Sequence, residues 1–295
     1  MKSFALVSTA ILLLLSCRKQ VEPLPQAQGF TFEQMAALPG VLTESSGLEM
    51  TGGKLFWSFN DNNGLPELYG FDQSGILKHT LKLSNAENVD WEDMAQDENG
   101  NIYVGDIGNN GNDRQDLKIY KLPLPETTQP NLEMTAEVIE FSYEDQTAFP
   151  PPERDWHFDS EAMFAKGGWL YLLTKDRSKP FAGKTRLYRL PGSPGTHQAE
   201  FVAEFFTAQT KTLGQVTAAD ISPDGTVLAL LTNEMLYLFK DFPGDDYFAG
   251  KSERWELPVM LQMEGVVFRD SCTLFLTNEE KPGGAALLFK VNICQ

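Results

Sequence analysis

The chain has 295 residues, of which 41 are acidic and 24 are basic, and its formal net charge is −17. This charge repels nucleic acids and anionic membrane surfaces at long range, so we exclude a nucleic-acid polymer as a partner. The same charge suits solubility or the binding of a cation. An apolar content of 42% is sufficient for one large core.

The start of the chain has the pattern of a targeting segment. An apolar run at 4–15 is too short to span a membrane as a helix. It leads into Leu-Leu-Ser-Cys, ending at Cys17, which resembles a bacterial lipobox. We expect a signal peptide at 1–16, lipidation of Cys17, a polar tether at 17–28 and a membrane anchor in the bacterial cell envelope. Arg18 favours the outer membrane and leaves its face undecided.

A short motif recurs five times in the remaining chain and sets its period. The copies are Glu44-Ser45-Ser46-Gly47-Leu48, Asp90-Trp91-Glu92-Asp93-Met94-Ala95, Asp159-Ser160-Glu161-Ala162-Met163, Val216-Thr217-Ala218-Ala219-Asp220-Ile221 and Met263-Glu264-Gly265-Val266-Val267. Counted from Ser45 through Glu92, Glu161 and Thr217 to Glu264, the spacings are 47, 69, 56 and 47 residues. Repeats near this period that carry several strands each indicate a β-propeller.

Each motif is followed by strand patterns separated by Gly, Asn and Pro turn signals. The predicted strands are 47–50, 55–60, 67–72 and 76–83; 93–96, 101–105, 117–124 and 137–143; 162–165, 169–174, 186–190 and 201–207; 218–222, 227–232, 235–240 and 253–257; and 265–268, 273–277 and 286–291. We therefore predict that residues 29–295 form an all-β, five-bladed propeller of four-stranded antiparallel blades.

The last predicted blade lacks its outermost strand. Propellers commonly close the ring with one chain terminus, which removes an exposed edge. We expect Phe30-Thr31-Phe32 to supply that strand, with the ring closed by the N-terminal strand. The sequence predicts no helix of normal length after residue 40, although a short helical turn at 32–38 is also compatible with the pattern.

Export places the remaining cysteines in an oxidising compartment. Cys272 begins one predicted strand and Cys294 follows the strand that pairs with it, so these two ends meet in an antiparallel blade. A Cys272–Cys294 disulfide fits this geometry and would stabilise the fold by about 3 kcal/mol in the chain-entropy model. Two unpaired buried thiols are the alternative.

The motifs and the ends of the second strands converge on one face of the disc, because the innermost strand of an antiparallel blade begins beside the end of the second strand. The carboxylates of Glu92, Glu161 and Glu264 occupy equivalent inner positions and would repel one another unless a cation lies between them. Calcium accepts carboxylate and hydroxyl oxygens, whereas zinc prefers His or Cys, which these positions lack. The predicted Ca²⁺ ligands are Ser46, Glu92, Glu161, Thr217 and Glu264. Ser45 is an alternative to Ser46. The alternative role of the acids is to lock the ring by accepting hydrogen bonds from backbone N–H groups of the adjacent blade.

One ligand per blade, in this order and spacing, is similar to calcium-activated nucleotidases (apyrases), five-bladed propellers with Ca²⁺ in the central channel. Leu55–Asp61 and Ile102–Gly108 look like motifs of that family, and the chain also resembles a broad group of bacterial exported propeller lipoproteins of undefined role. The nucleotidase resemblance implies that Asp61 or Asp106 positions or deprotonates water. It also implies a phosphate-binding role for basic side chains on the same face, namely Arg114, Lys175 and Arg177. Thr217 departs from the serine of that family.

Three functions remain open. The first is a Ca²⁺-dependent hydrolase of phosphoanhydrides or phosphate esters, with a small phosphorylated molecule as substrate. The second is a non-catalytic propeller that binds a protein or glycan partner, and the third is a Ca²⁺-dependent lactonase or esterase. No nucleophile elbow or phosphate-cradling Gly-Lys-Ser/Thr loop occurs, so covalent catalysis is not expected. We expect the protein to be a monomer.

Overall fold

The computed structural model describes residues 29–61, 64–124, 129–280 and 284–294. The predicted signal peptide, the lipidation site Cys17 and the tether lie outside these residues. Within the described residues, strands dominate and the one α-helix, α1 (Lys211–Gly214), has four residues. Two short 3-10 turns, η1 (Glu153–Asp155) and η2 (Tyr247–Ala249), complete the helical structure of this part of the chain, and no helix in it is long and apolar enough to cross a bilayer.

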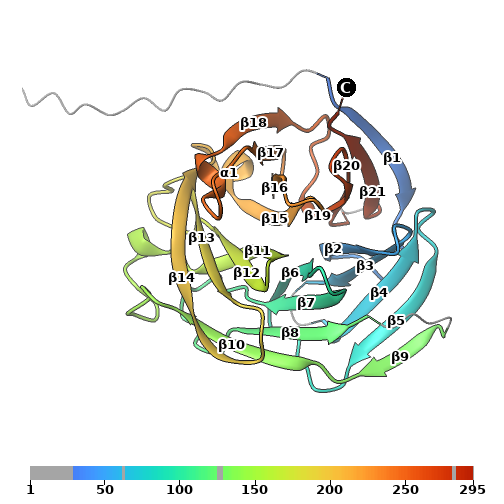
Figure 1. Cartoon of the computed structure of the whole chain (residues 1–295), viewed down its shortest axis with the longest axis horizontal. Helices are drawn as coiled ribbons and strands as arrows, with labels where there is room; N and C mark the ends of the chain where they lie inside the picture. The colour runs from blue at the N-terminus through green and yellow to red at the C-terminus, as the bar shows by residue number, and fades with distance from the viewer. Residues whose placement is uncertain (1–28, 62–63, 125–128, 281–283, 295) are drawn as a thin grey trace, which may run out of the picture.

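The strands form four hydrogen-bonded sheets around a common centre (Figure 1). The first sheet contains β2 (Ser45–Thr51), β3 (Leu55–Asn60), β4 (Glu67–Asp72), β5 (Leu77–Leu83) and β9 (Asn131–Met134). The third contains β15 (Val216–Ile221), β16 (Val227–Thr232), β17 (Met235–Lys240) and β18 (Lys251–Glu256). Nearly all of these strands lie where the turn signals and alternating patterns predict them.

The second sheet has eight strands, so the blades are less separate than the sequence predicts. One half contains β6 (Trp91–Gln96), β7 (Asn101–Asp106), β8 (Lys118–Pro123) and β10 (Glu137–Tyr143). The other half contains β11 (Asp159–Lys166), β12 (Trp169–Lys175), β13 (Lys184–Pro191) and β14 (Gly195–Phe206). The halves join because β14 begins six residues before its predicted start, and its first part pairs in parallel with β10. This pairing covers an outer edge of β10 that would otherwise be open.

The fourth sheet confirms the predicted role of the N-terminal segment. It contains β1 (Thr31–Ala37), β21 (Leu287–Asn292), β20 (Thr273–Asn278) and β19 (Met263–Asp270) in that order. The antiparallel pairing of β1 with β21 makes β1 the outermost strand. The alternative of a helical turn at 32–38 is wrong, because these residues gain sheet hydrogen bonds and Phe32 packs on Phe289. A disulfide joins Cys272 to Cys294 beside the same strands, with Cα atoms 5.1 Å apart.

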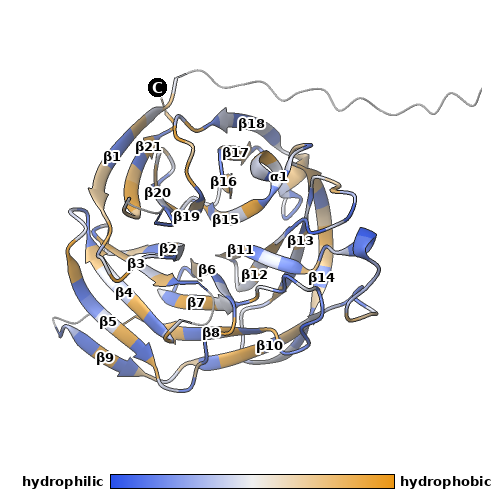
Figure 2. Ribbon diagram, turned by 180° about the vertical axis from the view of Figure 1, so that it is seen from behind, coloured by the Kyte–Doolittle hydropathy of each residue, from blue (hydrophilic) through white to orange (hydrophobic). Residues whose placement is uncertain are grey.

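The central strands form a closed ring. Strand β2 contacts β6, β6 contacts β11, β11 contacts β15, β15 contacts β19, and β19 contacts β2 again. Hydrophobic residues occur along the strands of every sheet (Figure 2), and each buried cluster combines residues of two neighbouring groups of strands. For example, Phe56 of β3 stands edge-on to Phe275 of β20 at 4.8 Å between ring centroids. The apolar core therefore lies between the sheets and leaves the central axis to polar side chains.

Candidate functional site

β-Bulges coincide with the predicted ligands on the central strands. In four central strands the register shifts by one residue at the same point, and the residue left out of the ladder is Glu92, Glu161, Thr217 or Glu264. A bulge bends its strand and redirects the extra side chain. The first central strand has its own register shift, immediately after Ser46. All five predicted ligands are buried.

Ser46 and Ser45 point to different neighbours. The Ser46 hydroxyl donates to the backbone carbonyl of Glu92 at 2.5 Å, across to the adjacent central strand. The Ser45 hydroxyl instead shares a 2.9 Å hydrogen bond with Ser58 of its own sheet. Of the two serines, Ser46 is therefore the one that contacts the ring of predicted ligands.

Two groups of carboxylates have the spacing of metal ligands. One oxygen from each of Glu92, Asp159 and Glu161 lies within 4.8 Å of the others, and the same is true of Asp61, Asp90 and Glu92. Glu92 belongs to both groups. Sequence reasoning missed Asp90 and Asp159 as site residues, although each stands two residues before a predicted ligand in an Asp-x-Glu sequence. These acidic groups, the second of them partly exposed, could hold a metal ion.

Cationic side chains from the end of β12 share this acidic centre. Lys175 Nζ lies 2.8 Å from Glu161 Oε2, and Arg177 Nη2 lies 2.8 Å from Glu161 Oε1. Arg177 Nε also contacts Asp159 Oδ2 at 2.5 Å. The contacts follow from the antiparallel pairing of β11 with β12, in which Asp159 is the register partner of Lys175. Lys175 and Arg177, two of the three predicted phosphate-binding residues, thus contact a predicted metal ligand directly.

The pKa values of the buried acids differ with the charges that act on them. Burial opposes ionisation of Glu161, but Lys175 and then Arg177 hold its pKa below the usual value. Burial and the charge of Glu161 raise the pKa of Glu92 well above its usual range. Burial also raises the pKa of Glu264 to about 8, against the effect of Lys175. Ionisation of Glu92 and Glu264 is therefore disfavoured, and a bound cation would favour their ionised forms.

Thr217 is one of several residues of the described chain with a buried polar side-chain atom that lacks a hydrogen-bond partner. Its Oγ1 is buried and has no hydrogen-bond partner among the described residues. An unsatisfied buried hydroxyl costs about 1–3 kcal/mol, so native structures rarely leave one without a partner. Carboxylates and a hydroxyl are the oxygen ligands that hard divalent cations prefer. The residues present therefore fit such a cation.

Asp106 and Arg114 form a second ion pair on the same face. Arg114 Nη1 donates to Asp106 Oδ1 at 3.0 Å and to the carbonyl of Gly108 at 2.8 Å. Arg114 Nη2 is buried and has no partner within the described residues. Asp106 is itself buried and also accepts the backbone N–H of Asp90. Asp106 therefore orients Arg114, whereas Asp61 stands within the acidic group that contains Glu92.

The alternative role of the acids, as locks between blades, belongs to other residues. Asp93 Oδ2 accepts the backbone N–H groups of Met163 at 2.8 Å and Ala219 at 3.2 Å, on two different central strands. Asp220 Oδ2 accepts the N–H of Phe268 on the next central strand at 2.6 Å. These two acids connect the ring, and the sequence analysis assigned them no role.

Comparison with solved structures identifies the class of fold. The PQQ-bound aldose sugar dehydrogenase of Streptomyces coelicolor matches with a TM-score of 0.55 and 9% identity, covering 91% of this chain and 99% of that one. A streptogramin B lyase structure matches with a TM-score of 0.49 and 9% identity, covering 90% of this chain and 98% of the other. No protein-family model and no curated protein sequence matches the chain. The architecture and the first likeness establish a β-propeller protein.

Proposed function

We propose that this protein is an exported, lipid-anchored β-propeller with a Ca²⁺ site in its central channel, and that it hydrolyses phosphoanhydrides or phosphate esters. The observation that carries the proposal is the group of buried carboxylates around Glu92 and Glu161, together with the cationic side chains that contact it. The buried Thr217 hydroxyl, which lacks a partner among the described residues, adds to it. The anchor rests on the lipobox-like sequence ending at Cys17, and the resemblance to calcium-activated nucleotidases suggests the substrate class.

Five blades are the count that we propose for the ring. Dividing the eight-stranded sheet at its parallel β10–β14 pairing leaves two antiparallel groups of four strands. The other three sheets each contain one such group, and β9 adds an outer strand to the first of them. The five central strands, each of which contacts the next around the ring, agree with this count.

The proposed Ca²⁺ ligands are the residues presented by the central strands. They are Ser46, Glu92, Glu161, Thr217 and Glu264. When bound, calcium would polarise a phosphoryl oxygen and favour ionisation of a coordinated water. Lys175 and Arg177 would share the charge of Glu161 with that cation, which keeps this carboxylate ionised.

The remaining proposed roles concern substrate and proton transfer. Arg114 has a buried N–H without a partner among the described residues and can donate it to a phosphoryl oxygen. Arg177 is a quarter exposed and can reach the same anion from the neighbouring blade. Asp61 would accept a proton from the attacking water through a carboxylate oxygen, and Asp106 would position Arg114.

Phosphate release by the full-length protein tests this proposal. The substrates would be nucleoside diphosphates, nucleoside triphosphates and p-nitrophenyl phosphate, each with CaCl₂ or with EDTA. We expect release that requires calcium and that falls at least about 100-fold in Glu92→Gln. Glu133→Gln removes an exposed acid of β9 and should leave the rate unchanged. Release that persists in EDTA, or no release from any substrate, would contradict the proposal, and lactone turnover would favour an esterase.

A further inference from the structure

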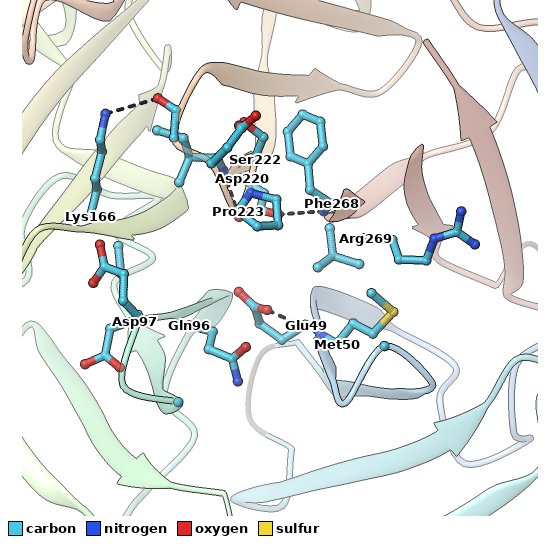
Figure 3. Close-up of a pocket in the computed structure, with 18 of the residues that line it drawn as sticks. Glu49, Met50, Gln96, Asp97, Lys166, Asp220, Ser222, Pro223, Phe268 and Arg269 are labelled. Atoms are coloured by element: carbon cyan, nitrogen blue, oxygen red, sulfur yellow. Dashed lines mark hydrogen bonds between the residues drawn. The ribbon is translucent and has the colours of Figure 1, made fainter. Parts of the chain in front are cut away.

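A cavity opens at the end of the central strands opposite the acidic site. Its walls include the turns that follow the central strands, around Gly52, Gly100 and Gly225, whereas the acidic site uses residues near the beginnings of those strands. The cavity has a volume of about 640 Å³, in the range of small-molecule sites. Figure 3 shows its lining residues. On β6, Asp93 stands between Glu92 of the proposed calcium site and Gln96 of the cavity lining. Its side chain accepts hydrogen bonds from three backbone N–H groups.

Five acids line this cavity, and they are Glu49, Asp97, Glu98, Asp220 and Asp224. Glu49 is only 4% exposed, and Figure 3 shows its side chain reaching into the space between Gln96, Asp220 and Phe268. Glu49 Oε2 accepts the N–H of Met50 at 3.2 Å. Burial, followed by the charge of Asp220, raises the pKa of Glu49 well above its usual range, and burial raises the pKa of Asp220 to about 7. The pair therefore lacks the stabilisation that an opposite charge would give.

The basic residues of the lining do not supply that charge. Lys166 Nζ donates to the carbonyl of Gly225 at 3.2 Å and lies over the ring of Phe242. Arg269 points away from Glu49 (Figure 3), with Nε on Asp270 at 3.0 Å and Nη2 on Thr273 at 3.1 Å. Among the described residues, no ion pair includes Glu49 or Asp220. The charges that act on Glu49 are those of two acids, Asp220 and then Asp93, and both raise its pKa.

The shape and chemistry of the cavity favour an organic cation over a bare metal ion. No third His, Cys, Asp or Glu of the described residues joins Glu49 and Asp220 at metal-ligand spacing. Both oxygens of Asp220 already accept backbone N–H groups, from Ile221 and Phe268. A calcium ion needs six to eight oxygens, and this wall offers too few. The lining also contains apolar side chains, Met50 and Phe268 among them, which suit an aliphatic group.

We propose that this cavity binds a small organic cation, an ammonium or guanidinium group on a short aliphatic body, with Glu49 and Asp220 as its anionic partners. The cationic group would lie between the two carboxylates and neutralise their repulsion, and the aliphatic body would contact Met50 and Phe268. This site is independent of the proposed calcium site, because the two use opposite ends of the central strands and share no residue.

Ligand-observed NMR titration of the full-length protein tests this inference, with n-butylammonium as the probe. We expect saturable binding, at least tenfold weaker in the double variant Glu49→Gln/Asp220→Asn and at least threefold weaker in each single variant. These substitutions keep the side-chain volume and remove charge, and Glu133→Gln on the outer strand β9 should bind as the wild type does. Thermal unfolding of each variant confirms that it is folded.

Neutral and metallic competitors decide what the cavity recognises. n-Butanol and butyrate should fail to displace n-butylammonium, because they lack the positive charge. The inference is overturned if n-butylammonium does not bind the wild type, if the double variant binds it equally well, or if butanol competes equally. The inference is also overturned if CaCl₂ displaces n-butylammonium from the wild type but not from the double variant, since the cavity would then be a metal site. None of these outcomes depends on phosphate release.

Discussion

Replacing Asp93 by alanine tests how the central strands of the ring are held together. This fully buried carboxylate accepts three backbone N–H groups, those of Met94 at 2.8 Å, Met163 at 2.8 Å and Ala219 at 3.2 Å. The three donors belong to β6, β11 and β15. One side chain therefore connects three consecutive central strands, and alanine removes all three contacts.

The magnitude follows from the groups that alanine leaves unsatisfied. Each buried N–H without a partner costs about 1–3 kcal/mol. Burial raises the pKa of Asp93 well above its usual range, so its removal also relieves a desolvation cost, and the net effect lies toward the lower end of the sum. We expect a loss of about 3–5 kcal/mol in the free energy of unfolding, which corresponds to a decrease in Tm on the order of 10 °C.

Thermal unfolding followed by circular dichroism measures this decrease. Asp93→Asn keeps one acceptor oxygen for Met163 and Ala219, so it should lose less than half as much stability as Asp93→Ala. A Tm of Asp93→Ala within about 2 °C of the wild type, the range of an ordinary surface substitution, would refute the reasoning. In that case the contacts between the apolar sheets alone would hold the ring.

Three further predictions address the acidic site, the pH dependence and the C-terminus. A Cβ at Gly108 would collide with the carboxylates of Glu92 and Asp90. Gly108→Ala should therefore weaken calcium binding at least tenfold, as measured by titration calorimetry. Gly40→Ala is the control, because a Cβ there meets no neighbour, and it should leave calcium binding unchanged. Burial raises the pKa of Asp220 from 3.8 to about 7, so the folded state keeps a proton that the unfolded chain loses. Stability should therefore fall by up to about 4 kcal/mol as the pH rises from about 4 to about 7, and urea titrations of Asp220→Asn should show a flatter dependence. Replacing Cys272 and Cys294 by serine should cost about 3 kcal/mol in the same assay, and an unchanged midpoint would contradict a stabilising disulfide.

The period of the motif predicted most of the strands, because it is set by local turn chemistry and alternation. Contacts between distant segments carry no such local signal. Strand β9 pairs in parallel with β5, although the sequence analysis predicted no strand at 131–134. The parallel pairing of β14 with β10 likewise joins residues more than fifty positions apart, which no turn pattern links.

The site was only partly predictable for a different reason. The sequence located Glu161 and Lys175 on the same face and gave them separate roles, but it does not determine that their side chains meet. The bulges that redirect Glu92 and Thr217 also depend on pairing with the next strand. The sequence did contain a signal for the cavity lined by Glu49 and Asp220, since each of these acids stands three residues after a predicted ligand.

Calcium-dependent stabilisation tests the central claim most directly. The full-length protein, treated with EDTA and then dialysed, would be unfolded thermally with and without CaCl₂, beside Glu92→Gln and the control Glu133→Gln. At a calcium concentration one hundred times Kd, binding should add about 2.7 kcal/mol and raise the Tm by several degrees in the wild type and the control. Glu92→Gln should lose most of this shift, because Glu92 belongs to both carboxylate groups. An equal shift in Glu92→Gln, or no shift in the wild type, would contradict a calcium site in the central channel.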